Sequence, residues 1–148
     1  MGRITRHKAD GQAFERDFSS TMGERYYVRR LPTPGIKFAG ISQPADFILI
    51  GNFFNYVEVK ETAGERFQLS GLQQENEIRT FIQEKEKLKR NKLKCEVQYW
   101  LIVNFLKKGI VAIQGETVIE LIDNRKTLKP DEWELFPSLT ELREEGLF

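Results

Sequence analysis

Apolar side chains recur at helical spacing in two segments of the chain, and a third segment carries a helix-capping signal. A spacing of four among the apolar residues near the N-terminus predicts a first helix over residues 12–22. Residues 72–89 carry apolar side chains along one side and predict a second, longer helix. Near the C-terminus, Ser138 and Glu141 form a capping box, which predicts a short helix over residues 138–145.

In other segments apolar residues alternate with polar ones or follow one another without interruption, and both patterns predict strands. Two short apolar runs flank Gly51 and Asn52, so we interpret residues 46–60 as a β-hairpin. Residues 97–105 are rich in β-branched and aromatic side chains and predict a central strand. Further strands are expected at residues 25–31, 110–113 and 118–122.

The order of these elements predicts the fold class. A helix, a strand, a hairpin, a helix, further strands and a last helix indicate an α/β (α+β) protein with a central mixed β-sheet flanked by α-helices. The chain has 148 residues, which is the usual size of one domain. We therefore expect a single domain over residues 11–148, preceded by a flexible basic arm at residues 1–10.

Composition and charge narrow the class of protein. Cys95 is the single cysteine and cannot form an internal disulfide, and no apolar run approaches the ~18 residues that span a bilayer. We therefore expect a cytoplasmic protein without membrane contact. Residues 1–108 carry 19 Lys and Arg against 13 Asp and Glu, whereas residues 109–148 carry 4 against 9. Such asymmetry is expected of a protein with a nucleic-acid-binding face, and it also arises by chance.

The predicted hairpin brings three charged side chains together. In its second arm, the strand period of two places Glu58 and Lys60 on one face and Val57 and Val59 on the other. Asp46 begins the first arm and can lie beside Glu58. Two buried carboxylates repel each other, which costs free energy unless a cation lies between them. Mg²⁺ or Mn²⁺, which prefer oxygen ligands, would remove this repulsion. The lysine could then polarise a metal-bound water, which is the chemistry of phosphodiester hydrolysis. The alternative is that Glu58 and Lys60 form the solvated face of an ordinary edge strand.

These charged residues and the segments around them resemble a known group of nucleases. Asp46, Glu58 and Lys60 match the pattern of the PD-(D/E)XK nuclease superfamily. Flanking segments resemble, in order along the chain, the RecU family of Holliday junction resolvases. They are residues 11–18 (GQAFERDF), 28–34 (VRRLPTP) and 58–62 (EVKET), which resemble that family's opening helix, its basic strand into Pro-Thr-Pro and its Glu-Ala-Lys-Glu-Thr segment.

The resemblance implies a restriction-endonuclease-like core and a Mg²⁺-dependent endonuclease, with Mn²⁺ as a substitute, that acts on branched DNA as a homodimer. Asp46 and Glu58 would be metal ligands, and the backbone carbonyl of Val59 would be a third. Lys60 would position or deprotonate the attacking water. Glu15, on the first helix, would orient the site through the water shell of the metal.

The chain departs from the RecU pattern at three points. Only 11 residues separate Pro34 from Asp46, where the family carries a longer insertion that forms a stalk. Pro44 stands where the family has a threonine, so one oxygen near the metal is missing. The family has a glutamine on the helix after the lysine strand, where this chain aligns Asn76, with Gln73 and Gln74 close by. These amides and several basic side chains are the residues that we expect to contact DNA: Arg29, Arg30, Lys37, Arg66, Gln73, Gln74, Asn76, Lys89 and Arg90.

Three functions are compatible with these observations. The first is a junction resolvase with a trimmed stalk, in recombination or repair, which would suit a phage or mobile-element protein. The second is a PD-(D/E)XK nuclease that acts on flaps, ends or duplex DNA. The third is a DNA-binding accessory protein without nuclease activity, which Pro44 favours and the joint presence of Asp46, Glu58 and Lys60 opposes.

Overall fold

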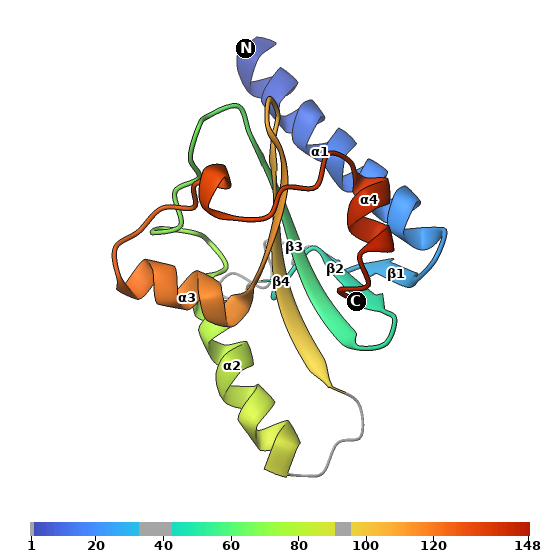
Figure 1. The fold of residues 1–148 in the computed structure, drawn as a ribbon, viewed down its shortest axis with the longest axis vertical. Coiled ribbons are helices and arrows are strands. Elements are labelled where there is room, and N and C mark those ends of the chain that lie inside the picture. Colours follow the sequence, from blue (N-terminus) through green and yellow to red (C-terminus); the bar gives the residue numbers. More distant parts are fainter. Residues whose placement is uncertain (1, 33–42, 91–95) are drawn as a thin grey trace.

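Five strands form one mixed sheet in the computed structural model, which describes residues 2–32, 43–90 and 96–148 (Figure 1). The strands are β1 (Tyr27–Arg30), β2 (Phe47–Ile50), β3 (Phe54–Thr62), β4 (Val97–Phe105) and β5 (Gly109–Gln114). They are adjacent in the order β1-β2-β3-β4-β5, and neighbours run antiparallel except β3 and β4, which are parallel. The predicted α+β fold with a mixed sheet is therefore confirmed.

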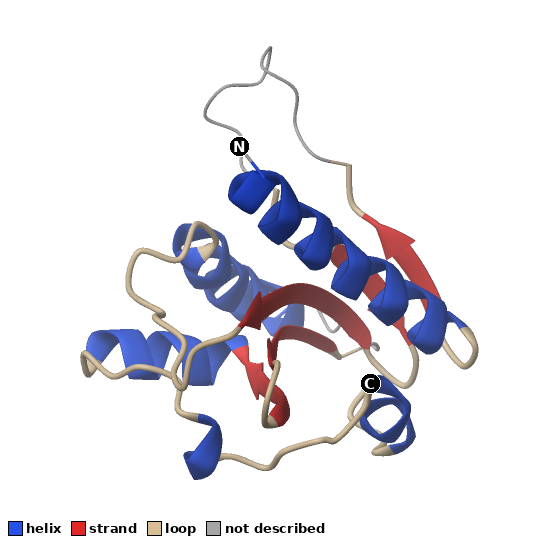
Figure 2. Ribbon diagram, turned by 90° about the horizontal axis from the view of Figure 1, so that it is seen from above, coloured by secondary structure: helices blue, strands red, loops and turns tan. Residues whose placement is uncertain are grey.

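Helices cover both faces of this sheet. Helix α1 (Gly2–Gly23) and the short α4 (Leu139–Glu144) lie on one face, and α2 (Glu75–Arg90) and α3 (Gly115–Asp123) lie on the other (Figures 1 and 2). Helix α2 lies in the crossover that a parallel β3–β4 pair requires. A 3₁₀ turn, η2 (Pro130–Glu132), precedes α4. Among the described residues, no helix is both long and apolar enough to span a bilayer.

The first helix is longer than the sequence pattern predicts. It begins at Gly2, so residues 2–10, which were predicted to form a separate basic arm, continue the helix, and their flexibility stays a prediction. This segment contains no proline, and each residue added to an existing helix gains a backbone hydrogen bond. The C-terminal part of α1 is fixed by Phe14, Phe18 and Met22, which are buried against the sheet as their spacing predicts.

Two hydrophobic clusters, one on each face, hold the sheet between the helices. The first packs α1 and α4 against the sheet, and the second packs α2 and α3 against the opposite face. Strand β4 is buried along nearly its whole length because it contributes to both clusters. This explains why its sequence reads as continuously apolar. Val57 and Val59 of β3 belong to the first cluster, so Glu58 and Lys60 point to the α2 side.

One predicted strand is a helix. Residues 118–122 lie in α3, not in a strand. Val118, Leu121 and Ile122 also satisfy the i, i+3, i+4 spacing of a helix, and a short apolar run does not distinguish the two periods. The first residue of α3, Gly115, lies close to Ile78, so that a Cβ there would be 3.0 Å from the Ile78 side chain.

The remaining expected elements are present with adjusted ends. The hairpin turn comprises three residues, because Ile50 pairs with Phe54, and the long helix begins at Glu75 rather than at residue 72. The C-terminal helix is capped as predicted, since the Ser138 side chain accepts a hydrogen bond from the Glu141 N–H.

Candidate active site

The hairpin places Asp46 directly opposite Glu58. The β2–β3 register pairs Phe47 with Val57, so the preceding residue, Asp46, faces the following one, Glu58. Residues two apart share a face of a strand, which adds Lys60 to the same side. The Asp46 side chain accepts a hydrogen bond from the Val59 N–H at 3.0 Å, and this bond fixes its position beside β3. The predicted convergence of two carboxylates and an ammonium is therefore present.

Glu58 is a buried carboxyl with an unusual environment. It is only 1% exposed, and its Oε2 has no hydrogen-bond partner within the described residues. Burial, and next the neighbouring Asp46 carboxylate, raises the pKa of Glu58 to about 9. The Lys60 ammonium, 3.5 Å from Glu58 Oε1, acts in the opposite direction but does not offset the other two causes. Glu58 is thus not the solvated residue of an ordinary edge strand.

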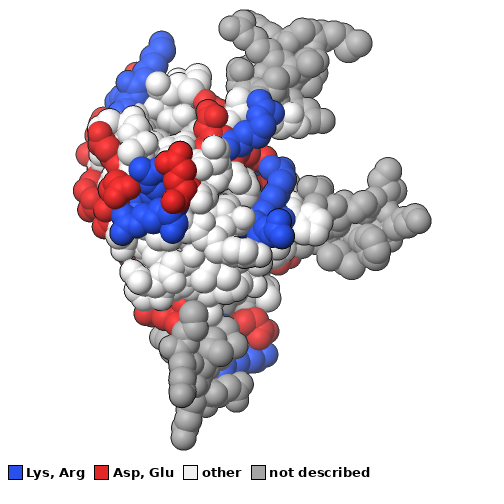
Figure 3. Space-filling view, turned by 90° about the vertical axis from the view of Figure 1, so that its right-hand side faces the viewer, with Lys and Arg blue, Asp and Glu red and all other residues white. Residues whose placement is uncertain are grey.

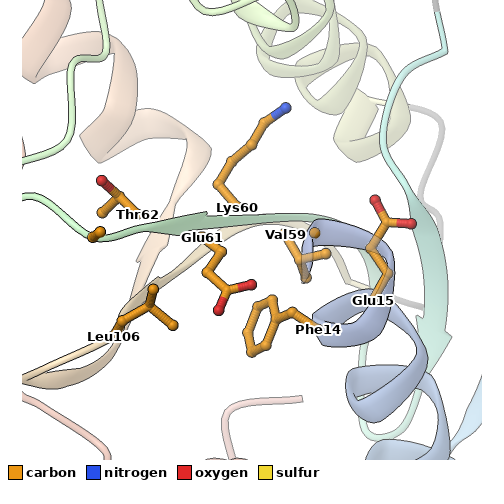
Figure 4. A pocket seen from close by; sticks show the side chains of 9 residues that line it. Phe14, Glu15, Val59, Lys60, Glu61, Thr62 and Leu106 are labelled. Atoms are coloured by element: carbon orange, nitrogen blue, oxygen red, sulfur yellow. The ribbon is translucent and has the colours of Figure 1, made fainter. Parts of the chain in front are cut away.

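Lys60 also lines a pocket at the end of β3. The pocket has a volume of about 380 Å³ and is bordered by residues from α1, β3 and the end of β4 (Figure 4). In Figure 4 the Lys60 side chain rises on one side of the strand, while Glu61 and Phe14 lie on the other side. Glu15 of α1 also borders the pocket. Lys60 thus borders the pocket from β3, while its ammonium rises on the side of the strand away from Glu61 and Phe14.

Glu15 forms an ion pair with Arg30. It does not join Asp46 and Glu58 in a group of three carboxylates. The Arg30 guanidinium also lies 5.8 Å from the Phe47 ring centroid, and the contact of Arg30 with DNA stays a prediction. Neighbouring strand residues face opposite sides, so Arg29 lies on the face that carries Glu58.

Tyr99 is a residue of the site that the sequence did not identify. Its ring is buried, and its hydroxyl donates a hydrogen bond to the backbone carbonyl of Pro44, two residues before Asp46. Burial, followed by the charges of Glu58 and Asp46, raises the pKa of Tyr99. The parallel β3–β4 register, which pairs Tyr99 with Tyr56, brings it to this face, and nothing in the sequence fixes that register. The Pro44 carbonyl therefore links the segment before Asp46 to β4 through the Tyr99 hydroxyl.

The amides and remaining basic residues have different surroundings. Of the three predicted amides, Gln74 is buried, and its Oε1 has no hydrogen-bond partner within the described residues, whereas Gln73 and Asn76 are exposed. Arg66 is exposed in the loop after β3. Lys37 and the side chains of Lys89 and Arg90 lie outside the described part of the structure. Gln74 is thus the buried member of the three amides, and which of them serves the site stays a prediction.

Ion pairs engage many of the basic side chains. Figure 3, which shows the side of β1 and α4, has acidic and basic groups interleaved beside a broad uncharged area. This side is therefore mixed in charge, and it is not the continuous basic face that the charge asymmetry indicated. The pairs include Arg25–Glu144, Arg79–Asp123, Lys85–Glu116, Lys108–Asp131 and Arg143–Glu24.

A divalent cation fits the donor groups of the hairpin. Within the described ranges, no three His, Cys, Asp or Glu side chains form a metal-holding group, so the side chains offer a cation two carboxylates. The N–H and C=O of one strand residue point to the same side, and the Val59 N–H points at Asp46, so the Val59 carbonyl is available as a further oxygen. The unpaired Glu58 Oε2 is the atom that such a cation would satisfy.

Comparison with known proteins identifies the fold. A mixed five-stranded sheet with helices on both faces and an acidic pair on the central hairpin defines the architecture. This architecture is similar to the 1.6 Å structure of Hjc from Archaeoglobus fulgidus, described as a Holliday junction resolvase from an archaeal hyperthermophile. The TM-score is 0.60, with 16% sequence identity over 90% of this chain and 99% of that chain. No protein-family model and no curated protein sequence matches the chain.

Proposed function

We propose that this protein is a Mg²⁺-dependent endonuclease that cuts branched DNA, in the manner of a junction resolvase. The observation that carries the proposal is the pairing of Asp46 with a buried Glu58 whose Oε2 lacks a partner, beside the ammonium of Lys60. A buried, unpaired carboxyl oxygen costs stability unless a ligand satisfies it. The shared fold with an archaeal resolvase supports the same class of substrate.

Each residue of the site has a role in the proposed reaction. Asp46, Glu58 and the Val59 carbonyl would bind the cation, which would neutralise phosphate charge and lower the pKa of the attacking water. Lys60 would hold that water and stabilise the negative charge that develops on the phosphate. The Gln74 amide, buried and with an unpaired oxygen, would position the water or the phosphate.

The relation to the RecU family in particular rests on the sequence motifs around residues 11–18, 28–34 and 58–62. A homodimer follows from the proposed substrate, because resolving a four-way junction requires two cuts and thus two sites. Recombination or repair of DNA would be the corresponding cellular process. Mn²⁺ would replace Mg²⁺ because both prefer oxygen ligands.

The test is cleavage of a mobile four-way junction and of a matched linear duplex, each with Mg²⁺ or with EDTA. Wild type should make paired nicks at the junction only when Mg²⁺ is present. Lys60→Ala should lower the cleavage rate by about 10²- to 10⁴-fold while DNA binding persists. Lys126→Ala, which removes an exposed charge after α3, is the matched control and should cleave like wild type. Wild-type turnover by Lys60→Ala would contradict the proposed site.

A second candidate function follows from the short segment between Pro34 and Asp46. With 11 residues in place of a longer stalk, the protein has less chain with which to enter a junction. This favours a nuclease of the same chemistry that acts on flaps, ends or duplex DNA. Equal cutting of junction, flap and duplex substrates would support this second candidate over the first.

A further inference from the structure

The face of the sheet that carries the active site is covered by helices over only part of its width. Helices α2 and α3 pack on β4, and α3 also packs on β5, whereas β1 and β2 are at the other end of the sheet. On this face Tyr27 of β1 is 57% exposed, and its register partner on β2, Ile50, is 39% exposed. The sheet therefore presents an open aromatic and aliphatic surface beside the site.

Tyr27 and Arg29 form an ordered pair on this open surface. Val28, between them, packs in the cluster on the opposite face, so both flanking side chains project to the side of Glu58. The Arg29 guanidinium lies 5.9 Å from the Tyr27 ring centroid, and its Nε donates a hydrogen bond to the Tyr27 hydroxyl at 3.1 Å. Within the described residues Arg29 takes part in no ion pair, in contrast to Arg30. Its charge thus remains available to a ligand.

The pair lies within reach of a strand bound at the active site. Arg29 on β1 is in register with Ile48 on β2, and Ile48 is in register with Tyr56 on β3. Tyr56 is two residues before Glu58 on the same strand. Two strand spacings and two residues of strand rise place Arg29 about 12 Å from Glu58. This corresponds to roughly three or four nucleotides along a DNA strand.

We infer that Tyr27 and Arg29 form a stacking site for an unpaired base of the DNA substrate, near the strand that is cut. The inference rests on the proposed nuclease function and specifies its substrate as DNA that exposes bases at a branch. A planar ring held beside a planar cation offers stacking to any base and attraction to the adjoining phosphate. Ile50 adds an apolar surface next to the ring.

The experiment measures binding without cleavage, on the Lys60→Ala background in Mg²⁺. The probe is a four-way junction with 2-aminopurine at the branch, compared with a fully paired duplex that carries 2-aminopurine internally. The variants are Tyr27→Ala, Tyr27→Phe and Arg29→Lys, with Lys126→Ala as the charge-matched control. Affinity and quenching of the 2-aminopurine fluorescence by stacking are both recorded, and the cleavage activity of each variant with Lys60 intact is recorded separately.

Tyr27→Ala should weaken junction binding by about fivefold to 150-fold and abolish the quenching, with less than about a twofold change on the duplex. Tyr27→Phe keeps the ring and should retain the quenching, and Arg29→Lys should lose part of the affinity because lysine lacks the planar group. Unchanged junction binding, or an equal loss on the duplex, overturns the inference and leaves the nuclease intact. A loss of self-association in Tyr27→Ala also overturns it, since the surface would then bind a second copy. If wild type neither binds nor cuts DNA, the proposed function fails first.

Discussion

Asp46 and Glu58 face each other across the β2–β3 pair, yet their carboxyl oxygens are not equally engaged within the described residues. Asp46 accepts the Val59 N–H at 3.0 Å, whereas Glu58 Oε2 has no partner among the described residues. Glu58 therefore has a carboxyl oxygen that a bound proton or cation would satisfy. The β2–β3 hairpin thus both buries Glu58 and leaves its Oε2 without a partner among the described residues.

Glu58 should make the metal-free protein less stable as the pH rises. With a pKa of about 9 in the folded protein and 4.5 when unfolded, its stabilising contribution is complete below pH 4.5 and is lost as the pH rises through 9. The free energy of unfolding should fall by up to about 1.4 kcal/mol per pH unit in this window. Urea unfolding in EDTA at pH 6 and pH 9 measures it. Glu58→Gln should flatten the dependence, and the exposed Glu120→Gln should not; parallel curves for all three would refute this account of Glu58.

Asp46→Asn should separate metal binding from folding. The amide oxygen of asparagine can still accept the Val59 N–H, so the melting temperature in EDTA should change little. One carboxylate is lost, however, so titration calorimetry should show a large decrease in Mg²⁺ affinity, and cleavage should lose its Mg²⁺ response. An unchanged Mg²⁺ titration would remove Asp46 from the cation site.

Tyr99→Phe tests the positioning of Asp46 from β4. The substitution deletes the hydrogen bond to the Pro44 carbonyl and should cost about 1 kcal/mol of stability. Because Pro44 leads directly into Asp46, Mg²⁺ affinity should fall as well. Tyr56→Phe is the matched control, since this neighbouring ring stacks on Tyr99 at 6.3 Å and its hydroxyl makes no hydrogen bond within the described residues. Loss of stability with unaltered Mg²⁺ affinity would show a purely structural role.

Gly51→Ala should destabilise the hairpin turn. A Cβ at this position would lie 2.6 Å from the Phe148 carbonyl oxygen and 2.8 Å from the Tyr26 ring, so the backbone or the ring must move. We expect a loss of about 1–3 kcal/mol in the free energy of unfolding. Gly23→Ala is the control, because a Cβ there meets nothing within 4 Å, and it should be neutral or stabilising by up to about 1 kcal/mol. Equal stability of both variants would show that the turn relaxes without cost.

Local patterns predicted most of the fold. The hairpin and the central strand 97–105 were identified because alternation and β-branched content are local signals. Residues 118–122 were misassigned because a short apolar run satisfies both periods, and only packing against α2 selects the helix. The early start of α1 was missed because its first turns carry no strong pattern.

The acidic pair of the site was also predictable, since Asp46, Glu58 and Lys60 are brought together by one hairpin. The roles of Arg30 and Tyr99 were not, because each depends on an element far away in the chain. Arg30 pairs with Glu15 on α1, and Tyr99 reaches Pro44 across a parallel register. The exposure of Tyr27 likewise depends on how far α2 and α3 extend over the sheet, which the sequence does not state.

The close-packed hairpin turn has a consequence for how this chain can vary. Asn55, just after the turn, donates hydrogen bonds to the carbonyls of Leu49 and Phe53, and Phe53 donates its N–H to the Phe148 carbonyl. A single inserted residue that slipped the register would exchange the two faces of β3 and send Glu58 and Lys60 into the hydrophobic cluster under α1. The count of 11 residues between Asp46 and Glu58 is therefore as necessary to the site as the carboxylates themselves. Natural variants of this chain should tolerate substitutions in the turn more readily than changes in its length.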